Sequence, residues 1–227
     1  MRSIGVWGLA ASLALLTTHA SVRAADYFVE PLAQPAPAGE VSAAVAEKLS
    51  STGFVVKSGK RTLCEIWPAK SWSVAADFKP SNTVIYPLEM GELLGVVRYA
   101  RKGGDFRGQD IPKGVYTLRY SLQPQDGNHI GTSDTRDFIA LVPAADDESP
   151  EPIDKAQLFK LSPKVAGGTH PAILCLLASS GEPAEAPEIV HDEARELWSV
   201  RFTNPTTAGG KSGKLTIQLV VVGRAAE

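Results

Sequence analysis

An alternating strand between Gly114 and Leu122 constrains the fold of this chain more than any other feature. Its large apolar side chains Tyr116, Leu118 and Tyr120 recur at every second position, which is the period of a strand with one buried face. A polar loop follows, and the chain returns through residues 137–142, which are apolar on both faces, as in a more central strand. The two segments predict an antiparallel hairpin within a larger sheet.

Most of the remaining chain indicates short strands separated by turns. The further strands that we expect are residues 27–32, 54–56, 62–67, 83–88, 93–100, 172–178, 197–202 and 215–221. Helical patterns are brief: residues 40–49 carry one apolar face, and Leu158, Leu161 and Val165 form a stripe in a helix expected to begin at residues 149–150. Strands do not alternate with full helices. The sequence therefore predicts an all-β fold, an antiparallel β-sandwich of jelly-roll or immunoglobulin-like type with one or two short helices.

The N-terminal residues 1–24 have the three parts of a secretory signal peptide. Arg2 supplies a positive start, residues 4–16 form an apolar run, and Val22 and Ala24 are the small residues that a signal peptidase requires. The apolar run is too short to cross a bilayer, which takes about 20 residues, and no later segment is long or apolar enough. We therefore expect cleavage after Ala24, a periplasmic or secreted protein, and no membrane span after signal removal.

Composition and charge narrow the domain organisation and the partners. The chain carries 23 basic and 25 acidic residues, and loss of a leader that holds Arg2 and Arg23 lowers its net charge from −2 to −4. Proteins that bind nucleic acid usually present a basic face, so nucleic acid is not an expected partner. A Pro-rich segment favours an N-terminal extension over residues 25–39, followed by a single sandwich domain over residues 40–227.

Two cysteines occur in the expected mature chain, Cys64 and Cys175. An even number of cysteines in an exported protein favours a disulfide, so we predict a Cys64–Cys175 bridge. Two buried free thiols are the alternative, because an unpaired cysteine packs like a small hydrophobic side chain. Cys-x-x-Cys spacing is absent, and a redox or zinc motif is not indicated.

The loop of the central hairpin holds the densest group of polar side chains. Asp126, Asn128 and His129 crowd this loop, and Arg136 and Asp137 follow it. These residues could form a polar ligand site, and Asp126 and His129 are suitable ligands for a divalent metal. Ordinary turn chemistry is the alternative, since Asp-Gly and Asn tolerate positive φ and bond their own backbone.

A metal centre would need further ligands from elsewhere in the chain. His170 and His191 could join His129 around a divalent metal, although nothing in their spacing requires it. No other cofactor is predicted. Arg107 and Asp110 precede the central strand and are expected nearer its opposite end, unless their loop folds back.

Five short segments carry a resemblance to a known group of proteins. They are Gly114-Val-Tyr-Thr-Leu-Arg-Tyr120, Gln123-Pro-Gln-Asp-Gly-Asn-His129, Arg136-Asp-Phe138, Cys64-Glu-Ile-Trp67 and Asp105-Phe-Arg-Gly108. In these segments the chain resembles a group of exported bacterial proteins of unknown function. The resemblance implies a β-sandwich, a cell-envelope or secreted location and a bacterial origin. It implies no reaction, ligand or functional residue.

Three functions are compatible with these features. The first is a non-catalytic binding or accessory module with an unknown protein or small-molecule partner, because Gly-x-Ser-x-Gly and His-Glu-x-x-His are absent and no catalytic residue is predicted. The second is a metal- or small-ligand-binding protein, with or without enzymatic activity, centred on the loop of residues 123–137. The third is a carbohydrate-binding module, for which Trp72 is the one stacking candidate, since Trp67 and Trp198 are expected in the core.

Overall fold

The computed structural model describes residues 27–127 and 131–225. The predicted signal peptide therefore lies outside the described residues, as do Asn128 and His129. The strands are β1 (Tyr27–Leu32), β2 (Gly53–Ser58), β3 (Arg61–Pro68), β4 (Trp72–Ser73), β5 (Leu93–Tyr99), β6 (Gly103–Gly104), β7 (Asp110–Ile111), β8 (Gly114–Leu122), β9 (Asp137–Pro143), β10 (Ile173–Leu177), β11 (Glu188–Asp192), β12 (Leu197–Ala208) and β13 (Lys211–Val222). The helices are α1 (Ala43–Lys48), α2 (Lys155–Leu161), α3 (Pro163–Ala166) and the 3₁₀ turn η1 (Ala144–Asp146). The prediction of an all-β fold is confirmed.

Across the described residues one continuous ladder runs in the order β1-β2-β3-β5-β8-β9-β10-β13-β12-β11, and β4 adds to β12. All pairs on this path are antiparallel, and the predicted hairpin forms with Leu118 opposite Leu141. The β12–β13 hairpin turns at Gly209 and Gly210, which both have positive φ. A turn of that kind matches the right-handed twist of its strands.

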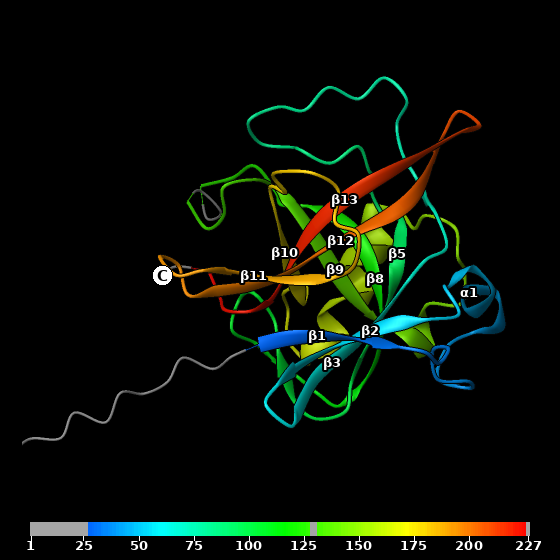
Figure 1. Cartoon of the computed structure of the whole chain (residues 1–227), viewed down its shortest axis with the longest axis vertical. Helices are drawn as coiled ribbons and strands as arrows, with labels where there is room; N and C mark the ends of the chain where they lie inside the picture. Colours follow the sequence, from blue (N-terminus) through cyan, green and yellow to red (C-terminus); the bar gives the residue numbers. More distant parts are fainter. Residues whose placement is uncertain (1–26, 128–130, 226–227) are drawn as a thin grey trace, which may run out of the picture.

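The sheet is strongly curled (Figure 1), and β10 changes partners along its length. Its first residues pair with β9, and Leu176 and Leu177 pair with β13. The two ends of the strand order approach each other, and the rings of Tyr27 and Trp198 meet edge to face with centroids 5.0 Å apart. The hydrogen bonding thus joins all these strands in one curled sheet, and it does not establish the two separate sheets of a jelly-roll or immunoglobulin-like sandwich.

The inner face of the curled sheet encloses the largest hydrophobic core. The side chains of β8 that were predicted to share a face, Tyr116, Leu118 and Tyr120, all lie in it. Residues Ile139 and Leu141 of β9 face the same core. Side chains at the alternate positions point to the outer face, which we define as the face opposite this core. Period-two alternation therefore identified the core-facing side chains of β8 correctly. The expectation that only one face of β8 is buried is wrong, because Thr117 and Arg119 on its outer face are also fully buried, beneath the segment that follows β9.

Two short helices and several loops cover parts of the outer face. Helix α1 packs Val45 against Trp67 and Val96, and helix α2 packs Leu158 against Val142 of β9. Ser42 and Asp154 accept hydrogen bonds from backbone N–H groups of the first turns of these helices, at 3.2 and 2.8 Å, which is ordinary N-capping. The outer face of β9 and β10 is only partly covered, and the candidate site lies there.

Three predictions about elements are corrected by the structure, and one strand was missed. Residues 83–88 are not a strand, because the Asp137 carboxylate takes two of their N–H groups that a sheet would use. Helix α2 begins after Asp154 rather than near residue 149, because the carbonyls of residues 149 and 151 bind Arg119. Strand β11 was not predicted. Strand β1 belongs to the sheet, so residues 27–32 are not part of an extension.

Both cysteines are free and buried thiols in the structure. Cys64 faces the inner core from β3, whereas Cys175 points from β10 into a cluster on the outer face. Three strands separate β3 from β10 in the sheet, and neighbouring strands lie about 4.8 Å apart. A disulfide needs Cα atoms within about 7 Å. The predicted Cys64–Cys175 bridge is therefore absent from the structure.

Candidate functional site

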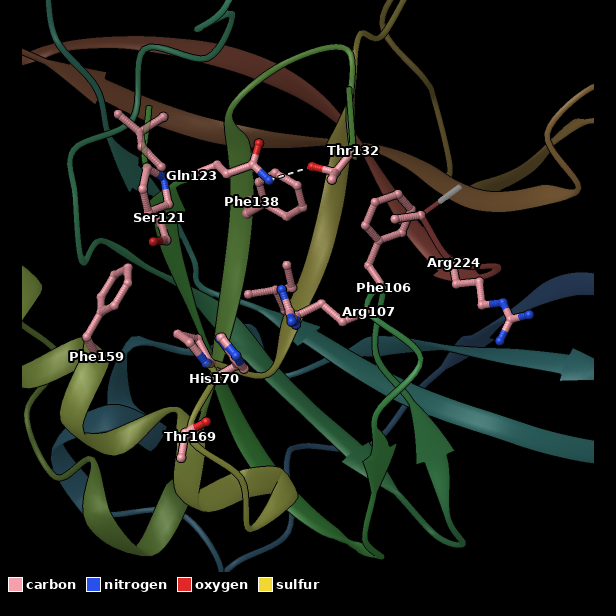
Figure 2. Close-up of a pocket in the computed structure, with 15 residues that line it drawn as sticks. Phe106, Arg107, Ser121, Gln123, Thr132, Phe138, Phe159, Thr169, His170 and Arg224 are labelled. Carbon is pink, nitrogen blue, oxygen red and sulfur yellow. Dashed lines mark hydrogen bonds between the residues drawn. The ribbon is translucent and has the colours of Figure 1, made fainter. Parts of the chain in front are cut away.

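A cavity of about 450 Å³ opens on the outer face of β8, β9 and β10 (Figure 2). This volume is within the range of small-molecule sites. It is bounded by α2, by the loops before β7 and β10, and by the C-terminal segment. Its lining residues are Phe106, Arg107, Ser121, Leu122, Gln123, Pro124, Thr132, Phe138, Phe159, Thr169, His170, Pro171, Ile173, Arg224 and Ala225. We call this cavity the outer pocket.

Aromatic side chains form the apolar walls of the outer pocket. Phe106 and Phe138 are buried, and their tilted rings lie 6.0 Å apart, so they make a fixed wall. Phe159 projects from α2 on the other side and is only partly buried (Figure 2). Such rings offer large flat contact areas with little loss of side-chain entropy, which suits an aromatic or branched aliphatic guest.

The polar groups of the outer pocket are few and come from different segments. Gln123 Nε2 donates to Thr132 Oγ1 at 2.7 Å, which joins the two ends of the hairpin loop at the pocket edge. The Arg107 side chain extends into the pocket between Phe138 and His170, whereas Arg224 points away from it (Figure 2). Not one of the described lining residues is acidic. The pocket is therefore apolar with a positive side.

The loop that carries Arg107 is held by a buried carboxylate. Asp105 is 4% exposed, and its Oδ1 accepts the N–H groups of Arg107 and Gln109 at 3.0 and 2.7 Å. Its Oδ2 accepts Gln109 Nε2 at 2.8 Å and the N–H of Ile173 at 3.2 Å. These bonds fold the loop back onto the start of β10. Arg107 consequently shares a pocket with Gln123, although the sequence placed it nearer the opposite end of the strand.

The structure separates the residues that were predicted as a polar ligand site. Asp126 and Arg136 line a second hollow of about 480 Å³ beside the hairpin loop, and Arg136 Nε donates to the Gln123 carbonyl at 2.7 Å. Asp137 lies elsewhere: it is fully buried and does not line this hollow. The remaining two members of the prediction, Asn128 and His129, are outside the described residues.

Asp137 has a structural role in the core. Its carboxylate accepts the N–H groups of Ile85 and Tyr86 at 3.0 and 3.2 Å and the Tyr120 hydroxyl at 2.6 Å. Burial, followed by the hydrogen bond and the charge of Asp137, raises the pKa of Tyr120, so its hydroxyl stays protonated and donates. The bonds from Ile85 and Tyr86 pin residues 83–88 against the start of β9, and the bond from Tyr120 holds the carboxylate in place.

The predicted histidine site is not assembled from the residues that the structure describes. His170 lines the outer pocket. His191 lies on β11 and stacks on Trp198, with ring centroids 3.9 Å apart and planes 9° from parallel. Within residues 27–127 and 131–225, no group of three His, Cys, Asp or Glu side chains is placed to hold a metal ion. His129, the third member, lies outside those ranges.

Trp72 is not exposed, contrary to the prediction that made it a stacking candidate for carbohydrate. It is completely buried, and its Nε1 donates to the Leu94 carbonyl at 2.9 Å. The short strand β4 draws it inward by pairing in parallel with β12. Trp67 is buried as predicted, and Trp198 is partly covered by His191. The hypothesis of a carbohydrate-binding module therefore no longer has the exposed tryptophan on which it depended.

Sequence reasoning missed most of the outer pocket. Phe106, Phe159 and Arg224 were not considered, and they come from a loop, a helix and the C-terminal segment. One usable signal was present: Asp105 precedes Arg107 and Gln109 at the spacing of a side-chain-capped turn. That signal predicts an ordered loop, but it does not say where on the sheet the loop lies.

Fold and pocket together describe a curled β protein with an apolar, positively charged pocket on its outer face. No family model, curated protein or solved structure matches the chain. Among the described residues, no helix has the length and apolarity needed to cross a membrane. The function is therefore inferred from the pocket itself.

Proposed function

We propose that this protein is an exported β-sheet module that binds a small ligand with a mainly apolar body in the outer pocket. The main support for this proposal is the structure of the pocket. The buried Phe106 and Phe138 form a fixed wall, and Phe159 faces it across a cavity of about 450 Å³. Cavities in protein cores are usually much smaller, and apolar concave surfaces of this size are typical of ligand sites. Binding rather than catalysis is proposed, since the chain lacks a recognisable catalytic motif.

Export rests on separate support, the signal-like residues 1–24 and the resemblance to exported bacterial proteins. N-terminal sequencing of the protein recovered from a bacterial periplasm or medium tests it. A chain that begins at Ala25 is the expected result. A chain that begins at Met1 would refute cleavage.

The binding proposal is tested with a neutral probe that has an aromatic body, 4-phenylbutanol. Truncation of Phe159 to alanine removes one wall of the pocket, and the loss of an aromatic contact is worth about 1 kcal/mol, or roughly fivefold in affinity. Isothermal titration calorimetry of the wild type and Phe159→Ala should show that weakening. Phe28→Ala is the matched control, because Phe28 is an exposed phenylalanine on β1, outside the pocket.

Circular dichroism and the melting temperature of each variant accompany the titration, so that loss of folding is not mistaken for loss of binding. Equal weakening by both variants, or the same affinity in Phe159→Ala as in the wild type, would place the probe elsewhere. Binding undetectable at millimolar probe would contradict the proposed function.

A further inference from the structure

The ionisable side chains that line the outer pocket are all basic. Arg107, His170 and Arg224 line it, and no described lining residue carries a carboxylate. The whole chain has a formal net charge of −2. The ionisable residues of the pocket therefore differ in sign from the excess charge of the chain as a whole. A positive pocket on an acidic protein concentrates anions locally.

The Arg107 guanidinium is available to a ligand. It forms no ion pair or hydrogen bond with another described residue, and the nearest carboxylate in sequence, Asp105, is already occupied by four N–H donors. Arg107 is an exposed residue at the pocket, whereas the two buried arginines are engaged: Arg119 binds Asp147, and Arg201 binds Glu188. An arginine that is directed into an apolar pocket and has no partner can form an ion pair with an anionic group of a ligand.

The geometry favours a carboxylate as that anion. A guanidinium presents parallel N–H groups that match the two oxygens of a carboxylate, and one inward-directed arginine suits one negative charge. The aromatic walls beside it, Phe138 and Phe159, then hold the rest of the ligand (Figure 2). His170, on the other side of Arg107, adds a further ring N–H donor.

We infer that the ligand class of the outer pocket is a small monocarboxylate with an aromatic or branched aliphatic body, whose carboxylate pairs with Arg107. This inference rests on the proposed function, because it assigns the chemistry of the ligand to the same pocket. The Asp105-held loop is what makes the pair specific. It fixes the backbone of Arg107, so less freedom is lost when the ligand binds.

Three probes with the same apolar body and different head groups test the inference: 4-phenylbutyrate, 4-phenylbutanol and 4-phenylbutylamine. A hydrogen-bonded ion pair is stronger than its neutral counterpart, so calorimetry should show the carboxylate binding at least about tenfold more tightly than the alcohol. The amine should bind more weakly than the alcohol.

Arg107→Met keeps the apolar stem and removes the charge. It should reduce the preference for the carboxylate over the alcohol to about one, while the affinity for the alcohol changes little. Arg61→Met is the control: Arg61 is exposed at the β2–β3 turn and does not line the pocket, so the preference should persist.

Equal affinities of the acid and the alcohol in the wild type would overturn the inference and leave the proposed apolar pocket intact. The same holds if Arg107→Met retains the full preference. If both arginine variants lose it equally, the preference comes from net charge rather than from Arg107, and the inference fails. Absence of binding by all three probes would contradict the proposed function itself.

Discussion

Two buried aspartates order irregular segments of this chain by accepting backbone N–H groups. Asp105 closes the loop that carries Arg107, and Asp137 holds residues 83–88. A carboxylate has about four lone-pair sites, so it can replace several sheet hydrogen bonds at once. The neighbouring Arg136, by contrast, points to the open hollow at the hairpin loop. Adjacent charged residues therefore have unrelated roles here.

This difference explains which site residues could be predicted. Composition marked the Asp126-to-Asp137 region as polar, but the direction of each side chain depends on where β9 begins, and strand ends are the least certain part of a pattern. Because β9 starts at Asp137, its side chain is buried against Tyr86 and Tyr120 instead of joining Asp126. A loop sequence without its strand boundaries cannot distinguish these outcomes.

The thiols give a prediction at the scale of single residues. Burial raises the pKa of Cys64 to about 12 and that of Cys175 to about 11, whereas an unfolded thiol titrates near about 8.5. The neutral thiols therefore stabilise the folded state below about pH 8.5, and this stabilisation is lost as the pH rises toward the folded values. Between pH 7 and 8 the buried thiols of the native protein should not react with a chromogenic aromatic disulfide that detects free thiols.

Unfolding in guanidinium without reductant should then expose two reactive thiols per chain. The count is made with the same reagent, on protein that has never met a reducing agent. A count of zero would show that the cysteines pair with each other after all, and would contradict the opposite-face placement of Cys64 and Cys175.

At the scale of elements, one buried ion pair fastens the segment after β9 to the outer face of β8. Arg119 is fully buried, and its guanidinium binds both carboxylate oxygens of Asp147 at 2.8 and 2.7 Å. It also donates to the carbonyls of Gly91 at 3.0 Å and Glu151 at 2.8 Å, and to that of Ser149. Thr117 completes the pair by donating to Asp147. The start of α2, and hence Phe159, depends on this arrangement.

Removal of one member of this pair should destabilise the fold strongly. Arg119→Met leaves a buried charge without its partner, which lowers the free energy of unfolding by about 3–5 kcal/mol. Chemical denaturation followed by circular dichroism measures the change. The control is Lys102→Met in the exposed Lys102–Asp110 pair, where the change should be below about 1 kcal/mol.

The double variant Arg119→Met/Asp147→Leu distinguishes a charge effect from lost packing. Because it removes both charges, it should be more stable than Arg119→Met alone. A double variant less stable than the single one would mean that the pair acts mainly through shape.

Elements with regular periodicity were predictable, and elements whose partners are distant were not. The core-facing side chains of β8 follow from period two, and the buried stripe of α2 and α3 follows from helical spacing. Strand β11 has a weak pattern, because only one of its edges pairs, with β12, and its side chains are at most partly buried. Residues 83–88 have strand-like composition, yet a side chain elsewhere in the chain decides their conformation.

At the scale of the whole molecule, curling of the sheet creates the outer pocket. The change of partners at β10 lets Phe138 and Ile173 lie beside the C-terminal segment after β13. Register shifts in β2–β3, β5–β8 and β12–β13 add local bends and twist. None of these features leaves a mark in composition or periodicity. The all-β class could thus be predicted, but the curl and the pocket could not.

The most direct test of the outer pocket as a ligand site maps the bound position of 4-phenylbutyrate by ¹H–¹⁵N correlation spectroscopy of the protein. We expect saturable shifts at the amides around the outer pocket, namely Phe106, Arg107, Thr132, Phe159, Thr169 and His170. Amides near Asp126 at the second hollow and on the β2–β3 hairpin should move little. Shifts centred on the second hollow, or spread evenly over the surface, would contradict the assignment of the outer pocket as the ligand site.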